Sequence, residues 1–98
     1  MQKWEHLHVV YTGPMYTPAQ ITVWPSGVID LEWLNQRFGV RIRKTDGLDI
    51  IDKLFQNAPH VSKALIQYLG FNGWEAVVYY PNGVFFKRPL QDNDQGKD

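Results

Sequence analysis

The stretch that decides the fold is the last third of the chain, Gly70-Phe71-Asn72-Gly73-Trp74-Glu75-Ala76-Val77-Val78-Tyr79-Tyr80-Pro81-Asn82-Gly83-Val84-Phe85-Phe86-Lys87-Arg88-Pro89. It holds an Asn-Gly pair, Asn82 and Gly83, between two hydrophobic runs. Because both residues tolerate positive φ, this pattern is a strong signal for a β-hairpin. We predict strands over Trp74–Tyr80 and Val84–Arg88, preceded by a helix that ends in a left-handed residue at Gly70, with a second unusual φ at Gly73.

Two further strands are predicted near the start of the chain. Residues 4–11 alternate in polarity, with Leu7 and Val9 on one face. A loop rich in proline and glycine follows over Thr12–Pro18, and alternation returns over Ala19–Trp24. An isolated two-stranded hairpin is marginally stable in water, so the first strand should pair with the closing hairpin.

The middle of the chain is less regular. Residues 28–38 fit either a strand or a helix, and we favour a helix over Leu31–Phe38 with Asp30 as its N-cap and Gly39 just after its end. Val40–Lys44 alternates as a short strand.

A turn and two helices are predicted next. The turn is Thr45-Asp46-Gly47, and the first helix contains Leu48, Ile51, Leu54 and Phe55 at helical spacing, with Asp46 as a cap. A new helix is expected to begin near Asn57-Ala58-Pro59, because proline is tolerated only in the first turn of a helix. The second helix then runs from His60 to Leu69.

These elements predict an α+β fold, a small antiparallel sheet with helices packed on one face. A length of 98 residues and a hydrophobic content of 44% indicate a single globular domain over residues 1–90. Residues 91–98 are polar and lack an apolar anchor, so we expect a disordered tail.

Composition narrows the possible functions. The formal net charge is zero, which argues against a dedicated nucleic-acid or membrane-surface module. The absence of cysteine excludes disulfides and thiolate metal sites. The chain has no apolar segment typical of a signal peptide or a membrane span, so we expect a cytoplasmic location.

Short motifs at both ends resemble a known family. They are Lys3-Trp4-Glu5 before a Val-Val strand, Gly73-Trp74-Glu75 after a helix, and Phe86-Lys87-Arg88 in the closing strand. In this order they resemble the small bacterial domain of unknown function numbered 4177. The resemblance implies a fold but no activity, and it covers residues 3–11 and 61–89. Residues 12–57 are a long insert relative to that family, where any particular function of this chain would differ.

Candidate sites for metal binding or catalysis have little support. His6 and His8 share one face of a strand, and His60 is the third histidine, but no further ligand set accompanies them, so we predict no metal and no cofactor. No catalytic motif is present, which predicts a protein that is not an enzyme. The carboxylate pairs Asp49/Asp52 and Asp30/Glu32 are expected on solvated surfaces. Glu75 is expected to accept hydrogen bonds or to pair with Lys3 or Lys87.

The remaining candidates are interaction surfaces. Arg41 and Arg43 could bind an anion or single-stranded nucleic acid, but we favour their role as charges that protect an edge strand. The closing strands carry apolar residues on both faces, including Tyr79 and Phe85, which is more than a one-sided sheet needs. We therefore expect a small binding or assembly module that forms a homodimer through an aromatic sheet surface. A small apolar ligand held between sheet and helices is the alternative.

Overall fold

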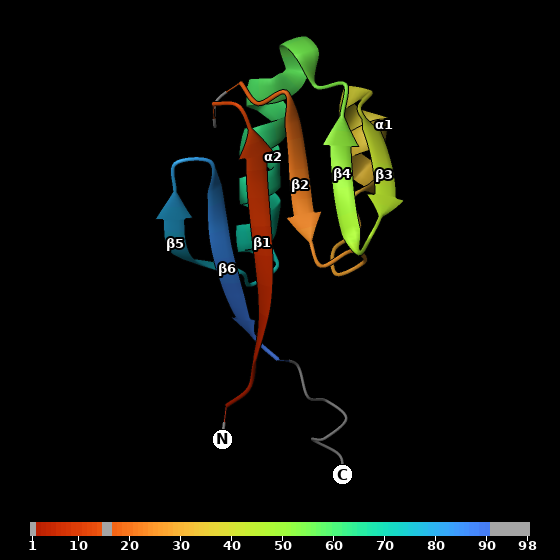
Figure 1. Ribbon diagram of the computed structural model, residues 1–98. Coiled ribbons are helices and arrows are strands. Elements are labelled where there is room, and N and C mark those ends of the chain that lie inside the picture. The colour runs from red at the N-terminus through yellow and green to blue at the C-terminus, as the bar shows by residue number, and fades with distance from the viewer. Residues whose placement is uncertain (1, 15–16, 91–98) are drawn as a thin grey trace.

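The computed structural model describes residues 2–14 and 17–90 (Figure 1). Within these ranges the strands are β1 (Trp4–Thr12), β2 (Gln20–Trp24), β3 (Arg41–Thr45), β4 (Leu48–Asp52), β5 (Glu75–Tyr80) and β6 (Gly83–Pro89). The helices are α1 (Glu32–Phe38), the 3-10 helix η1 (Phe55–Asn57) and α2 (Ala58–Phe71). The strands form one antiparallel sheet in the order β3-β4-β2-β1-β6-β5. The fold is therefore α+β, and the expected tail at 91–98 lies outside the described residues.

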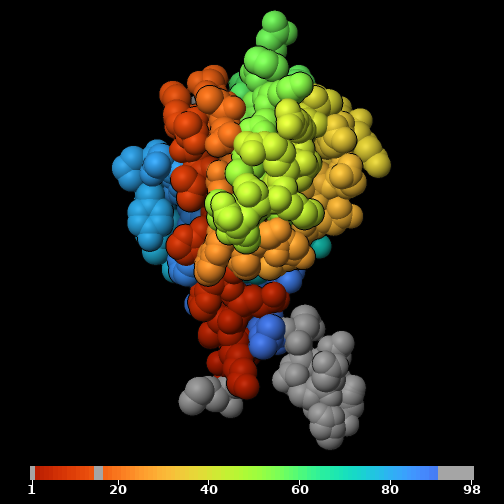
Figure 2. All heavy atoms as spheres, turned by 45° about the vertical axis from the view of Figure 1, so that its right-hand side comes forward, coloured from red at the N-terminus to blue at the C-terminus, as the bar shows by residue number. Residues whose placement is uncertain are grey.

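Strand β1 lies inside the sheet and joins its two halves. It pairs with β2 over His8–Thr12 and with β6 over Trp4–Val10. The predicted pairing of the first strand with the closing hairpin is thus confirmed. The first residues of β1 pair with β6, and Figure 1 shows this pair of strand ends extending beyond β2, β3 and β4, as the red and blue spheres do in Figure 2.

The segment 12–57, which was predicted as an insert, extends the sheet. Its strands β2, β4 and β3 continue the sheet from one side of β1, while β6 and β5 lie on the other side. The segments that carry the family resemblance therefore form one contiguous half, which contains β1, β6 and β5. The insert supplies the other half together with α1.

The buried residues of strands and helices belong to a single hydrophobic cluster. Strand β1 contributes Leu7, Val9 and Tyr11, and α2 contributes Leu65 and Leu69, all of them almost fully buried. Both helices lie behind the sheet in Figure 1. They also touch each other, because the rings of Trp33 and Tyr68 lie 4.8 Å apart and the Asn57 side-chain amide donates a 2.6 Å hydrogen bond to the Phe38 carbonyl.

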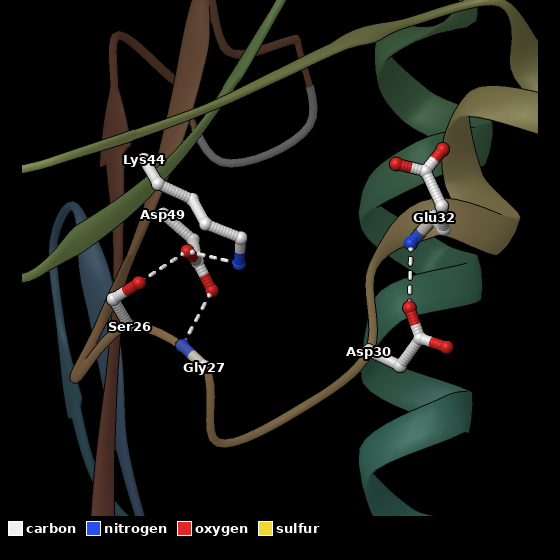
Figure 3. Close-up of polar contacts among 6 residues, drawn as sticks. All are labelled: Ser26, Gly27, Asp30, Glu32, Lys44 and Asp49. Carbon is white, nitrogen blue, oxygen red and sulfur yellow. Dashed lines mark hydrogen bonds and ion pairs between the residues drawn. The ribbon is translucent and has the colours of Figure 1, made fainter.

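The ambiguous segment at 28–38 contains the predicted helix. Helix α1 begins at Glu32, and Gly39 follows it in the left-handed conformation with φ 69°. Asp30 lies one residue before the cap position, yet its carboxylate accepts a 3.0 Å hydrogen bond from the Glu32 backbone N–H (Figure 3). The predicted strand at 40–44 is confirmed as β3, displaced by one residue.

The predicted helix over Leu48–Phe55 is wrong, because Leu48–Asp52 is strand β4. Asp46 and Gly47 both have positive φ, 51° and 77°, which is typical of a tight hairpin turn between β3 and β4. The adjacent β-branched residues Ile50 and Ile51 also favour a strand. The apolar residues of this segment match a helical spacing only by coincidence. A strand that is buried on one side can produce part of the same apolar pattern.

Two predicted glycine conformations are also wrong. Gly70 remains inside α2, whereas the unusual φ predicted at Gly73 is confirmed, at 85°. In the closing hairpin the turn residues are Pro81 and Asn82, neither of which has positive φ, and Gly83 is already the first residue of β6. Glycine is required there for another reason, since a Cβ at Gly83 would lie 2.7 Å from the Val9 carbonyl oxygen of β1.

Candidate functional site

The face of the sheet opposite the buried core carries exposed aromatic and apolar side chains. We call this cluster the open-face surface, and it consists of Trp4, His6, His8, Val10, Trp24, Val78, Tyr80 and Phe85. Their common face follows from the alternation along β1 and from the register, in which His8 lies opposite both Trp24 and Phe85. Trp24 is 47% exposed, Tyr80 48% and Val10 41%. Contiguous exposed apolar area of this kind is typical of interaction sites.

Ring contacts connect β1, β2 and β6 on the open-face surface. His6 stacks on Phe85, with centroids 5.3 Å apart and planes at 9°. His8 contacts Phe85 edge-on at 4.5 Å and Trp24 edge-on at 5.6 Å. Over the described ranges no three His, Asp or Glu side chains are grouped to hold a metal ion. The two histidines therefore act as members of an aromatic array.

Charged side chains lie at the two ends of the open-face surface. At one end the Lys87 ammonium lies 4.1 Å from the centre of the Trp4 ring. At the other end Asp52 accepts hydrogen bonds from the Arg43 guanidinium and from the Gln20 amide, the latter at 2.6 Å. The hydrogen bond from Arg43 lowers the pKa of Asp52, so this carboxylate stays charged.

The two arginines singled out from the sequence lie on an edge strand, since β3 is at one end of the sheet. The predicted edge position is thus confirmed. Arg43 is bound by Asp52, and Arg41 lies opposite the same carboxylate in the β3–β4 register. This acidic partner reduces the positive potential that an anion would meet at Arg41 and Arg43.

The structure does not bring Tyr79 and Phe85 together. Tyr79 lies opposite Val84, whose side chain faces the core, whereas Phe85 lies opposite His8 on the open face. The two rings therefore point to opposite faces of the sheet. A register shift between Ala76 and Val78 interrupts the alternation in β5, which places Val78 on the open face. Tyr79 is nevertheless 69% exposed, because it lies on an edge strand.

A buried carboxylate is the main polar feature that the sequence did not reveal. Asp49 has no exposed surface, so the expected solvated position is wrong for this residue, whereas Asp52 is partly exposed and is paired with Arg43. The Asp49 carboxylate accepts hydrogen bonds from the Ser26 hydroxyl at 2.7 Å, the Gly27 backbone N–H at 3.1 Å and the Lys44 ammonium at 3.0 Å (Figure 3). It thereby fastens the loop after β2 to the β3–β4 hairpin.

The charge state of Asp49 follows from these contacts. Burial raises the pKa of the Asp49 carboxyl, but the hydrogen bonds from Ser26, Lys44 and Gly27 outweigh it, and the pKa lies below its ordinary value. All of the contacts favour a fixed carboxylate with its acceptor oxygens occupied. The arrangement is that of a structural anchor, with no free oxygen directed toward a substrate.

The motifs on which the predicted family resemblance is based meet in space. Arg88 donates a 2.9 Å hydrogen bond to Glu5, and its guanidinium lies 4.3 Å from the Trp74 ring centre. Arg88 also donates to the Asn72 carbonyl in the turn after α2, at 2.9 Å. Glu75 lies opposite Lys87, but the Lys87 ammonium lies over Trp4 and no ion pair of Glu75 is found within the described part of the chain. These contacts are those of a folding motif that ties β1, β6 and the turn together.

Comparisons with protein-family models, with curated proteins and with solved structures find no match for this chain. The family resemblance therefore stays a prediction. Neither α1 nor α2 is long and apolar enough to cross a membrane, and no other α-helix occurs over residues 2–14 and 17–90.

Proposed function

We propose that the protein is a small assembly module in which two copies associate through the open-face surface. The helices pack on one face of the sheet and leave the other face to the partner copy. The observation that carries the proposal is the grouping of exposed side chains from four strands on that face, with Trp24, Tyr80 and Val10 each more than 40% exposed. Aromatic residues are enriched in the cores of protein interfaces.

The two edges of the sheet favour an interface that extends toward β5. Strand β3 carries Arg41, Arg43 and Lys44, and such charges protect an edge strand from pairing. Strand β5 carries no charge from Ala76 to Tyr80, and four consecutive residues there are at least 39% exposed. An edge of this kind is free to pair with another strand, so the partner copy should cover β5 together with the neighbouring part of the open-face surface.

Electrostatics are compatible with this pairing. The formal net charge is zero, so two copies do not repel each other at long range. The anion-binding alternative is less favoured because Asp52 occupies Arg43. The apolar-ligand alternative, the cytoplasmic location and a bacterial source stay predictions.

Charge placed on the open-face surface tests the proposal. Val10 and Val78 lie on neighbouring parts of that face, and a Val10→Glu/Val78→Glu variant should shift the light-scattering mass after size exclusion from dimer to monomer at high micromolar concentration. Phe55→Glu is the matched control, because Phe55 is 81% exposed in η1, away from the sheet. The control should remain a dimer, and a dimer that survives the double substitution contradicts the proposal.

A further inference from the structure

A cleft of about 400 Å³ lies between α1 and α2, on the helical side of the molecule. Trp33 and Arg37 line it from α1, and His60, Lys63, Tyr68 and Phe71 line it from α2. The α2 residues recur at spacings of three to five, so they form one stripe along that helix. A volume of this size falls within the range of small-molecule sites.

The charged residues that line the cleft are cationic. Arg37 and Lys63 are cationic, and no carboxylate belongs to its lining. Neither cation forms an ion pair within the described residues, in contrast to Arg43, Lys44 and Arg88. The Arg37 guanidinium lies 5.4 Å from the centre of the Phe38 ring. Both cations are therefore available to an anionic group.

The rest of the lining is mostly aromatic and consists of Trp33, Phe38, Tyr68 and Phe71, with His60, Ala64 and Gln67. Trp33 and Tyr68 are in ring contact, and Phe71 is 90% exposed at the end of α2. The Trp33 indole N–H is buried without a hydrogen-bond partner in the described part of the chain. The aromatic rings form flat apolar walls, which favour a planar ligand. The two unpaired cations beside them favour a ligand with a negative charge.

We infer that this cleft binds a small aromatic anion, a ring system bearing a carboxylate or a phosphate group. The ring lies against Trp33, Tyr68 and Phe71, and the anionic group is held by Arg37 and Lys63. The site is separate from the open-face surface, since it lies among the helices. Occupation of the cleft is therefore independent of self-association.

Binding is tested with 2-naphthoate and 2-naphthyl phosphate, using neutral 2-naphthamide as the uncharged analogue. In ¹H–¹⁵N spectra, titration of either anion should move the Trp33 indole resonance, assigned with a Trp33→Phe variant, to saturation at millimolar concentration or below. The amide should bind at least about tenfold more weakly, because it lacks the charge that the cations recognise. Whichever anion binds more tightly identifies the anionic group as a carboxylate or a phosphate.

Two double substitutions, each of which removes two positive charges, locate the site. Arg37→Gln/Lys63→Gln should weaken binding of the better anion by about tenfold or more, whereas Lys3→Gln/Arg41→Gln, which removes the same charge elsewhere, should leave it unchanged. Retained amide spectra show that each variant is folded. The inference is overturned if neither anion saturates, if the amide binds equally well, or if the resonances that move belong to Trp24 and Phe85 of the open-face surface.

Discussion

Asp49 shows how one residue joins segments that are distant in sequence. Its carboxylate binds Ser26 and Gly27, more than twenty positions earlier, and Lys44 on the neighbouring strand. A buried charge is favourable only when its hydrogen-bonding capacity is used, as it is here. This side chain therefore helps to hold the loop after β2, together with the 2.7 Å hydrogen bond from the Ser26 backbone N–H to the Gly47 carbonyl.

Replacement of Asp49 by Asn should lower the free energy of unfolding at pH 7 by about 2–4 kcal/mol, because the buried carboxylate loses its ion pair with Lys44 and its charged hydrogen bonds. Urea unfolding measures the change. Asp46→Asn is the control, since Asp46 is exposed in a turn with φ 51°, a conformation that Asn tolerates, and should change stability by less than about 0.5 kcal/mol. Equal effects of the two substitutions would contradict the anchoring role.

The pH dependence of stability should follow the lowered pKa of Asp49. A carboxyl whose pKa is lower in the folded chain stabilises it above the unfolded pKa of about 3.9, and this stabilisation is lost as pH falls through the folded pKa. The difference in unfolding free energy between the native chain and Asp49→Asn should therefore shrink below about pH 4. A difference that stays constant from pH 7 to pH 2 would refute this.

Tyr11 presents the opposite case, a buried polar group without a partner. Its hydroxyl forms no hydrogen bond within the described residues, and burial, with a smaller contribution from Tyr79, raises its pKa to about 12. An unpaired buried hydroxyl costs about 1–3 kcal/mol. Tyr11→Phe should therefore raise the unfolding free energy by about 1 kcal/mol in thermal unfolding. Tyr79→Phe, at an exposed position, should have no effect, and a destabilised Tyr11→Phe would show that the hydroxyl has a partner.

At the scale of elements, the β1–β6 contact depends on a glycine. A Cβ at Gly83 would meet the backbone of β1 at 2.7 Å, and backbone cannot move aside as a flexible side chain can. Gly83→Ala should therefore destabilise the chain by about 2 kcal/mol or more. Gly70→Ala is the counterpart in α2, where nothing lies within 4 Å, and should stabilise by about 0.5–1 kcal/mol. Urea unfolding of both variants checks the pair, and the opposite order of stabilities would show that β1 and β6 are packed differently.

The elements that could be predicted from sequence are those with local signals. The alternation of apolar and polar residues predicted β1 and β2, and Gly39 predicted the end of α1. Strand β4 could not be found from alternation, because it pairs with β2, which is distant in sequence, and its apolar residues also fit a helix. The Asp46-Gly47 turn was the signal that could have corrected it.

The candidate surface was predicted only in part for a similar reason. Phe85 lies on the open face, but the register shift in β5 directs Tyr79 to the other face, and a shift of this kind leaves no mark in the apolar pattern. The cleft between α1 and α2 was not predicted, since it joins the residues of two helices that are separated by a hairpin. The basic and aromatic residues that line the cleft indicate a binding site only when the two helices are known to lie side by side.

At the scale of the whole molecule, the sheet has two unequal edges and two unequal faces. One face packs into the core cluster and the other bears the open-face surface. The β3 edge is cationic and the β5 edge is uncharged from Ala76 to Tyr80. This asymmetry is the basis of the proposed self-association, which pairs the uncharged end of one copy with that of another.

The most direct test of the proposal is the mass of the unmodified chain by sedimentation equilibrium, measured from low to high micromolar concentration. The open-face surface predicts that the mass rises toward twice the 11.4 kDa of one chain as concentration increases. A mass that stays at 11.4 kDa over the whole range would contradict the account.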